Sequence, residues 1–484
     1  MTPNDDFAML IDGKPVSAVD RLAVTNPATE RVIAHVPDAS SQDLDAAVAS
    51  ARAAFPGWAA TPIAARRAAL EAMGDRMLAD IATLKQLLTS EQGKPLAEAE
   101  GEIGAAAYWL KATAALELPG GVIEDTPEHL VEMQPVPLGV VAAIVPWNFP
   151  VLLAMFKLAP ALLAGNTLVL KPSPVTPLTL LRFGAQVADL LPPGVLTIVT
   201  GGDRLGPWLT AHPGIDKVSF TGSTDTGRQV MRNAAATLKR ITLELGGNDP
   251  AIVLPDVDLE AVVPRLFWAA FGNAGQVCIA VKRLYVHAAI YDRLRDALVA
   301  YARTVRIGDG AAEGTQIGPL ASGAQRDRVT SLIADCRAHG YTLASSEDPA
   351  PGPGYFVPVT IVDNPPDDSR IVREEQFGPI LPLLQFSAVD EVVARANAGD
   401  YALGASVWSA DARQARDIAT RLASGIVWIN EVQHLSPTVP FGGRRQSGIG
   451  MENGIEGLKA YCDLRTIVTR KSPAQAQNLG ETEQ

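Results

Sequence analysis

The stretch from Val140 to Glu244 decides the fold class, because short apolar runs alternate there with segments of helix length. The runs are VVAAIV (140–145), TLVL (167–170), LTIV (196–199), KVSF (217–220) and ITLE (241–244). The intervening segments begin near Pro150, Pro177, Leu205 and Asp225. Continuous apolar strands separated by helices are typical of a parallel sheet that is covered on both faces. This stretch therefore predicts a doubly wound α/β fold.

Polar residues and glycines follow each of these predicted strands. The segments at the strand ends contain, in order, Asn148, Lys171, Gly201, Gly222 and Glu244. In open α/β sheets, ligands bind beyond the carboxyl ends of the strands. We therefore expect these residues to meet at one rim of the sheet.

A second α/β segment extends from about Asn248 to Gly443. Its apolar runs are AIVL (251–254), RLYVH (283–287), VTIV (359–362), GASVW (404–408) and GIVWI (425–429). Before the first sheet, residues 41–54, 62–88 and 96–116 have apolar residues at helical spacing and predict a helical cover. Residues 122–136 and the tail LKAYCDLRTIVTR (458–470) are expected to be strands outside both units. A terminal strand of this kind often pairs with another subunit.

Composition limits the possible functions. The chain has 484 residues, a net charge of −12 and no Lys/Arg run, which disfavours nucleic acid and anionic membranes as partners. Its N-terminus lacks an apolar signal core, and the uncharged stretch 133–156 holds four prolines, so no membrane span is expected. Only Cys278, Cys336 and Cys462 occur, which favours a reducing, cytoplasmic location. The histidines are not at metal-ligand spacing, so no metal site is predicted.

Two motifs carry possible chemistry. GSTDTGRQ (222–229) has Arg228 and Gln229 where a P-loop needs Lys and Ser/Thr, so it predicts a pyrophosphate turn without metal, or an ordinary βα turn. Cys278 lies in FGNAGQVCIA, a loop of small and polar residues that leaves the thiol room to react. Most free cysteines are small core residues, and we interpret Cys336 and Cys462 in that way.

Seven motifs together indicate a family. PWNFP, LKPSP, FTGST, LELGGNDP, GQVC, EEQFGP and PFGGRRQSG occur in the order and with much the spacing of the aldehyde dehydrogenase superfamily. The chain resembles the NAD(P)-dependent, non-acylating members of that family from Asn26 to its terminal strand. The resemblance implies a fold of two doubly wound parallel-sheet α/β domains plus a small β oligomerisation element. It places a dinucleotide-binding domain at 1–118 and 138–246, a catalytic domain at 247–443 and oligomerisation strands at 119–137 and 458–472.

The resemblance also assigns site residues. Cys278 matches the nucleophile, Glu244 the general base and Asn148 the amide that holds the oxyanion. The positions matching cofactor contacts are Val145, Pro146, Trp147, Lys171, Ser173, Pro174, Gly201, Gly206, Phe220, Thr221, Gly222, Ser223, Leu245, Gly246, Glu375 and Phe377. The positions matching the substrate tunnel are Leu153, Phe156, Val277, Ile279, His434, Leu435 and Phe441.

These assignments imply a reaction and leave alternatives open. Cys278 would attack an aldehyde, hydride would pass to NAD(P), and Glu244 would activate the water that releases the acid. Pro174 stands where many members have an acid that repels a 2′-phosphate, so we expect NAD with NADP possible. Apolar tunnel walls without arginine favour an aliphatic or aromatic aldehyde. The alternatives are a CoA-acylating enzyme, a cofactor-independent cysteine hydrolase or esterase, and a structural protein that has lost its activity. A homodimer or homotetramer is expected.

Overall fold

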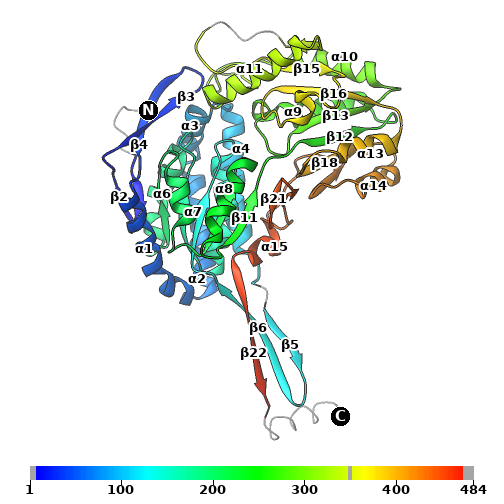
Figure 1. The fold of residues 1–484 in the computed structure, drawn as a ribbon. Helices are drawn as coiled ribbons and strands as arrows, with labels where there is room; N and C mark the ends of the chain where they lie inside the picture. The colour runs from blue at the N-terminus through cyan, green and yellow to red at the C-terminus, as the bar shows by residue number, and fades with distance from the viewer. Residues whose placement is uncertain (1–6, 119, 347–351, 472–484) are drawn as a thin grey trace.

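The computed structural model describes residues 7–118, 120–346 and 352–471. Two large sheets with helical covers form the body, and a narrow β-sheet extends from it (Figure 1). The predicted segments 1–118, 119–137 and 458–472 include residues 1–6, 119 and 472, which lie outside the described residues.

The first sheet has the strand order β2-β1-β9-β8-β7-β10-β11-β21. Its parallel strands are β7 (Val140–Ile144), β8 (Thr167–Lys171), β9 (Leu196–Ile198), β10 (Lys217–Thr221) and β11 (Arg240–Glu244). These are the five strands predicted from the sequence, which confirms that part of the analysis. Antiparallel β1 (Met9–Ile11), β2 (Lys14–Val16) and β21 (Gly448–Ile449) extend the two edges.

Helices cover both faces of the first sheet, and every position of the strands β7 to β10 is buried. Val141 and Leu168 belong to one core, whereas Val140 and Val169 belong to the core on the opposite face. The first core packs under α2 (Ile63–Ala79), α3 (Ile81–Gln92), α4 (Leu96–Ala114), α5 (Pro150–Ala164) and α6 (Leu178–Val187), the last followed by η1 (Ala188–Leu190). The second packs under α1 (Ser41–Ala60), α7 (Leu205–Ala211) and α8 (Thr224–Ala235). The single helix expected over 62–88 is two helices that meet at Asp80.

The second sheet has the strand order β14-β15-β16-β13-β12-β18-β19. Its strands are β12 (Asp249–Val253), β13 (Val281–His287), β14 (Thr342–Ser345), β15 (Thr360–Asp363), β16 (Ile380–Phe386), β18 (Gly404–Trp408) and β19 (Ile426–Ile429), all parallel except β14. Its helices are α9 (Leu259–Phe271), α10 (Tyr291–Ala302), α11 (Gly323–Ala338), α12 (Arg370–Arg373), α13 (Val389–Asn397) and α14 (Ala412–Ala419). The sequence analysis did not find β16, whose internal Pro382 argues against a central strand.

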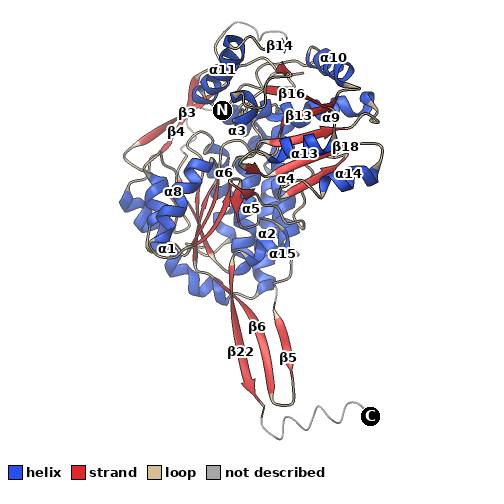
Figure 2. Cartoon of the chain, turned by 45° about the vertical axis from the view of Figure 1, so that its right-hand side comes forward, coloured by secondary structure: helices blue, strands red, loops and turns tan. Residues whose placement is uncertain are grey.

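The protruding sheet consists of β5 (Gly121–Asp125), β6 (His129–Pro137) and β22 (Cys462–Arg470) in the order β22-β6-β5 (Figure 2). Residues 122–136, expected to be one strand, form a hairpin in which the N–H of Thr126 donates to His129 O at 2.8 Å. A second unexpected hairpin joins β3 (Arg21–Asn26) to β4 (Arg31–Pro37). Short elements complete the chain: η2 (Gly272–Gly275), β17 (Tyr401–Ala402), β20 (Arg444–Arg445) and α15 (Gly454–Lys459).

No helix within the described ranges is long and apolar enough to cross a bilayer. In the same part of the chain, no group of three or more His, Cys, Asp or Glu side chains is arranged to hold a metal ion.

Candidate active site

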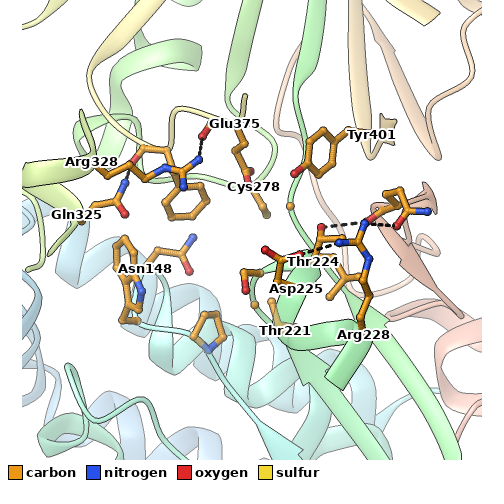
Figure 3. Close-up of a pocket in the computed structure, with 18 of the residues that line it drawn as sticks. Asn148, Thr221, Thr224, Asp225, Arg228, Cys278, Gln325, Arg328, Glu375 and Tyr401 are labelled. Atoms are coloured by element: carbon orange, nitrogen blue, oxygen red, sulfur yellow. Dashed lines mark hydrogen bonds and ion pairs between the residues drawn. The ribbon is translucent and has the colours of Figure 1, made fainter. Parts of the chain in front are cut away.

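A pocket of about 380 Å³ lies between opposite ends of the two sheets (Figure 3). From the first sheet it takes residues that follow strands, such as Asn148 after β7 and Gly222 after β10. From the second sheet it takes residues that precede strands, namely Cys278 before β13 and Glu375 before β16. The carboxyl edge of one sheet therefore meets the amino edge of the other across a shared cavity.

Cys278 lies on a tight loop between α9 and β13. Asn273 and Ala274 have left-handed φ angles of 49° and 56°, and Gly275 follows with φ 71°. Gly275 is required here because a Cβ at this position would lie 2.3 Å from Gly378 O. The loop carries the thiol into the pocket, where burial raises the pKa of Cys278 to about 12 and the Lys282 ammonium partly opposes that rise. The thiol is therefore protonated before a substrate arrives.

Asn148 is fixed at both its backbone and its side chain. Its carbonyl accepts Lys94 Nζ at 2.8 Å and Asn273 Nδ2 at 3.0 Å, and its own Nδ2 donates to Gln276 O at 3.0 Å. One amide hydrogen is used in this bond, and the other is available to a ligand. Because Gln276 is two residues before Cys278, the bond also ties the amide to the thiol loop.

Glu244 ends β11 as a buried carboxyl with only 3% of its surface exposed. Neither carboxylate oxygen of Glu244 forms a hydrogen bond of normal geometry with the described residues. Burial, followed by the neighbouring Glu452, raises its pKa well above the ordinary value, while Lys157 and the backbone N–H of Gly443 partly offset this. Such a carboxyl binds a proton more strongly than an exposed carboxyl does.

Glu375 and Phe377 lie on the amino edge of the second sheet, before β16. Glu375 accepts the Gly247 N–H at 2.9 Å and pairs with Lys282 at 3.3 Å. The Phe377 ring meets Trp147 edge to face at 5.4 Å between centroids. These residues and Trp147 line the same pocket as Cys278. All three are among the positions that the resemblance matches to cofactor contacts.

The glycine turn between β10 and α8 forms the opposite wall. Gly222 and Ser223 line the pocket, and Ser223 caps α8 by accepting the Thr226 N–H. A helix N-terminus carries partial positive charge and unused N–H groups, which suits a phosphate. Thr221, whose Oγ1 has no hydrogen-bond partner among the described residues, lies beside it.

The pocket includes part of the predicted cofactor set. Pro146, Trp147, Thr221, Gly222, Ser223, Leu245, Gly246, Glu375 and Phe377 line it, whereas Val145, Lys171, Ser173, Pro174, Gly201, Gly206 and Phe220 do not. Several of the second group lie near the ends of β8 and β9. There, burial lowers the pKa of Lys171 to about 8, and among the described residues its ammonium makes only a long bond, 3.5 Å, to Pro172 O. A nearly unsatisfied buried cation suits the hydroxyl groups of a ribose.

The predicted substrate residues are divided in the same way. Leu153 lines the pocket, whereas Val277, Ile279 and Phe441 form a separate small apolar cluster that Cys278 and Leu435 contact. Phe156 is 1% exposed and stacks on Trp109. It therefore packs between α5 and α4 and does not line the cavity. The side chain of His434 is exposed, and its carbonyl accepts Trp428 Nε1 at 3.0 Å.

The sequence analysis missed several pocket residues. They are Thr224, Asp225, Arg228, Gln325, Arg328, Asp400, Tyr401 and Gln446. The first three had a signal, because they follow Ser223 in the first turns of the predicted helix, and Gln446 lies in the PFGGRRQSG motif. Gln325 and Arg328 lie on α11, far away in sequence, and donate to Phe377 O and Glu375 O. They reach the site only through tertiary packing.

Taken together, these features define a doubly wound α/β protein with a candidate nucleophile and a candidate phosphate site in one pocket. Comparison with known proteins specifies the class further. The model of the aldehyde dehydrogenase family matches residues 15–467. Aldehyde dehydrogenase LUC3 of Fusarium sp is 41% identical over 469 residues, covering 96% of this chain and 99% of that protein.

Two further relatives agree with this match. Phenylacetaldehyde dehydrogenase of Pseudomonas fluorescens is 40% identical over 477 residues, covering 95% of each chain. The NAD+ complex of an aldehyde dehydrogenase from Bacillus cereus superposes with a TM-score of 0.94 at 38% identity, covering 97% of both chains. The chain therefore belongs to the aldehyde dehydrogenase family, a family of NAD(P)-dependent enzymes, which confirms the resemblance seen in the sequence.

Proposed function

We propose that this enzyme oxidises an apolar aldehyde to the carboxylic acid, with Cys278 as nucleophile, Asn148 as an oxyanion donor and Glu244 as general base. The observation that carries the proposal is that Cys278 and the glycine turn at Gly222 line one cavity. A thiol alone supports acyl chemistry, and a neighbouring dinucleotide site makes an oxidation possible.

The pocket fits a dinucleotide. A Cβ at Gly222 would lie 2.5 Å from the Phe220 ring, and one at Gly246 would lie 2.2 Å from Glu375 Oε2, so a side chain at either position would displace a group of this wall. Gly222 and Ser223 would hold the pyrophosphate, Lys171 and Ser173 the adenosine ribose, and Glu375 with Phe377 the nicotinamide riboside. The nicotinamide, when bound, supplies the acceptor for the hydride of the substrate.

NAD is the proposed cofactor, with NADP possible. Pro174 removes the acid that many relatives place against a 2′-phosphate. The carboxylates of Asp203 and Asp38 act on the Lys171 ammonium and raise its pKa against the effect of burial, so negative charge is present in this region. That charge favours ribose hydroxyls over a phosphate.

Each residue has a chemical task. The Cys278 thiol loses its proton to water, its sulfur bonds to the aldehyde carbon, and negative charge develops on the carbonyl oxygen. The free Asn148 amide hydrogen and the Cys278 backbone N–H would donate to that oxygen. After the carbon has lost its hydride, it forms a thioester with Cys278. Glu244, once ionised, removes a proton from the water that attacks the thioester, the C–S bond breaks and the acid leaves.

Substrate class follows from the wall beside Cys278. Leu153 and the apolar cluster of Val277, Ile279 and Phe441 offer no cation for a second carboxylate. An aliphatic or aromatic aldehyde is therefore proposed. The relative named as a phenylacetaldehyde dehydrogenase is consistent with an aromatic substrate.

The protruding sheet supports a homodimer or homotetramer. Val122, Ile123, Leu464 and Val468 expose 59 to 61% of their surface on its edge strands β5 and β22. Exposed apolar residues on unpaired edges are typical of surfaces that pair with another chain. All three cysteines are free thiols, which supports the proposal of a reducing location such as the cytoplasm.

The test is the appearance of reduced-nicotinamide absorbance with a panel of aldehydes and each dinucleotide. Acid formation with apolar aldehydes and NAD is expected. Acyl-CoA formation when free CoA is added would identify the acylating alternative. Ester hydrolysis without any aldehyde oxidation would identify the hydrolase, for which no histidine lines the pocket in the described structure.

A further inference from the structure

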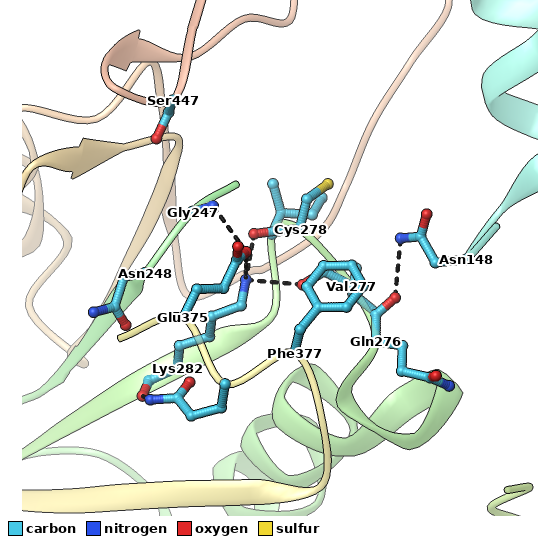
Figure 4. Close-up of polar contacts among 12 residues, drawn as sticks. Asn148, Gly247, Asn248, Gln276, Val277, Cys278, Lys282, Glu375, Phe377 and Ser447 are labelled. Carbon is cyan, nitrogen blue, oxygen red and sulfur yellow. Dashed lines mark hydrogen bonds and ion pairs between the residues drawn. The ribbon is translucent and has the colours of Figure 1, made fainter. Parts of the chain in front are cut away.

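Lys282 is a buried lysine on β13, four residues after Cys278. Only 3% of its side chain is exposed, although an ammonium group is among the least favourable groups to bury. The ammonium donates to Val277 O at 2.9 Å and to Cys278 O, and it pairs with Glu375 at 3.3 Å (Figure 4). Its three hydrogens thus have three acceptors, two of them on the loop that carries the thiol.

The bond to Val277 fixes the direction of the next N–H. The carbonyl of Val277 and the N–H of Cys278 belong to one trans peptide plane and point in opposite directions. Holding that carbonyl on the Lys282 side turns the Cys278 N–H to the other side, away from the ammonium. The Cys278 sulfur also points away from the ammonium (Figure 4).

The N–H of Cys278 is itself available. No hydrogen bond among the described residues uses it. The preceding carbonyl, of Gln276, accepts Asn148 Nδ2 at 3.0 Å. The Gln276 carbonyl therefore holds the Asn148 amide, and the Val277 carbonyl, bound to Lys282, orients the Cys278 N–H. These two groups are the expected oxyanion donors. An amide whose oxygen accepts from a cation is also a stronger N–H donor.

We propose that Lys282 is a positioning residue: its ammonium holds the Val277 and Cys278 carbonyls so that the Cys278 N–H serves the oxyanion, and it ties this loop to Glu375. This inference rests on the proposed function, because it assumes that Cys278 attacks a carbonyl. Lys282 does not line the pocket. It links the nucleophile loop to the residue expected to contact the nicotinamide ribose.

The test compares Lys282→Met and Lys282→Arg with a matched control, Lys239→Met. Lys239 is also buried and donates to two carbonyls, His212 O at 2.8 Å and Ile215 O at 3.0 Å, but it lies outside the pocket. We expect Lys282→Met to lower kcat about 10- to 100-fold with a smaller change in KM, because a displaced donor weakens transition-state binding. Lys282→Arg should recover part of the loss, and Lys239→Met should reduce thermal stability without changing kcat.

Alkylation of Cys278 by iodoacetamide gives a second readout that does not need turnover. The Lys282 ammonium lowers the thiol pKa, against burial, Asp249, Glu375 and Glu244, which raise it. Lys282→Met should therefore move the pH profile of alkylation to higher pH, and Lys239→Met should not. If Lys282→Met does not fold, Lys282→Gln keeps N–H donors without the charge and is expected to give the same shift.

The outcomes separate this inference from the proposed function. A wild-type enzyme that oxidises no aldehyde would overturn the proposed function, while the alkylation profile would still test the role of the Lys282 charge. An active wild type whose Lys282→Met variant keeps its kcat, or loses no more than Lys239→Met, would overturn the inference alone. So would a normal alkylation profile in a folded Lys282→Met or Lys282→Gln variant.

Discussion

The two sheets contribute to the pocket from opposite ends. The first sheet presents its carboxyl edge, where α5 and α8 begin and direct the positive ends of their dipoles toward the cavity. The second presents its amino edge, where Cys278 follows the carboxyl end of α9. One side therefore suits phosphates and a developing oxyanion. On the other side, burial disfavours a resting thiolate, because it raises the pKa of Cys278.

The two candidate catalytic groups, the Cys278 thiol and the Glu244 carboxyl, are therefore controlled in different ways. Behind Cys278, Lys282 gives its hydrogens to backbone carbonyls and thereby sets geometry. Behind Glu244, Lys157 pairs with Glu452, and these two charges act on the proton affinity of the carboxyl in opposite directions. At the amino edge of the second sheet, hydrogen bonds position the thiol. At the carboxyl edge of the first sheet, neighbouring charges set the proton affinity of the carboxyl.

The strongest test of this division is Cys278→Ala. Aldehyde oxidation should fall by more than about 10⁴-fold, because the proposed reaction proceeds through a bond to the Cys278 sulfur. Cofactor affinity, measured by titration, should stay unchanged, because most of the expected dinucleotide contacts come from the first sheet. A parallel loss of cofactor affinity would instead assign Cys278 a structural role.

Cys336→Ala is the matched control for that experiment. Cys336 is a fully buried thiol on α11 that does not line the pocket. Its substitution should cost about 1 kcal/mol of stability and leave the rate unchanged.

Glu244→Gln tests the proton side of the pocket. Steady-state turnover should fall about 10²- to 10⁴-fold, and a covalent acyl-enzyme should accumulate after one round of reduction. Only the ionised form of Glu244 can accept a proton. Because burial raises the pKa of this carboxyl, wild-type acid release should rise with pH through that raised pKa. The Gln variant should lose this rise. Mass spectrometry of the intact protein after one turnover measures the adduct.

Glu91→Gln is the control for a buried carboxyl outside the pocket. Burial raises the pKa of Glu91 to about 7, and its oxygens accept the N–H groups of Leu178 and Thr179 at the start of α6. This variant should lose stability but trap no acyl-enzyme. Absence of an adduct in Glu244→Gln would remove Glu244 from the deacylation step.

The same contrast between edges explains how much could be read from the sequence. The five strands of the first sheet and the residues after them were predictable, because apolar runs are visible and the carboxyl-edge rule is general. The rule gives no reason to look before a strand, so the residues alone did not place Cys278 and Glu375 near Gly222. Only the family resemblance connected them. Tyr401 and Arg328 carried no signal, because their approach depends on how two separate sheets pack.

Asn148→Ala should have a smaller effect than the two substitutions above. Removing one oxyanion donor typically lowers kcat about 10²- to 10³-fold. It should also leave Gln276 O, to which the amide donates, with only the longer bond of 3.4 Å from Asn273 Nδ2 among the described residues. As a control, Asn166→Ala removes a fully buried amide that binds Tyr461 O at 2.9 Å, away from the pocket, and should reduce only thermal stability. Equal kinetic losses in both variants would mean that Asn148 supports the fold and not the reaction.

The smallest expected effect compares one glycine on each edge. A Cβ at Gly222 would lie 2.5 Å from the Phe220 ring, so that ring must shift within the proposed pyrophosphate site, whereas nothing lies within 4 Å of a Cβ at Gly272. Gly222→Ala should raise the dissociation constant for NAD about tenfold, equivalent to about 1.4 kcal/mol, because the wall must move to admit the phosphates. Gly272→Ala, near the thiol loop, should change neither NAD binding nor kcat. Calorimetric titration of both variants measures the difference, and equal affinities would show that the carboxyl edge of the first sheet does not hold the pyrophosphate at this turn.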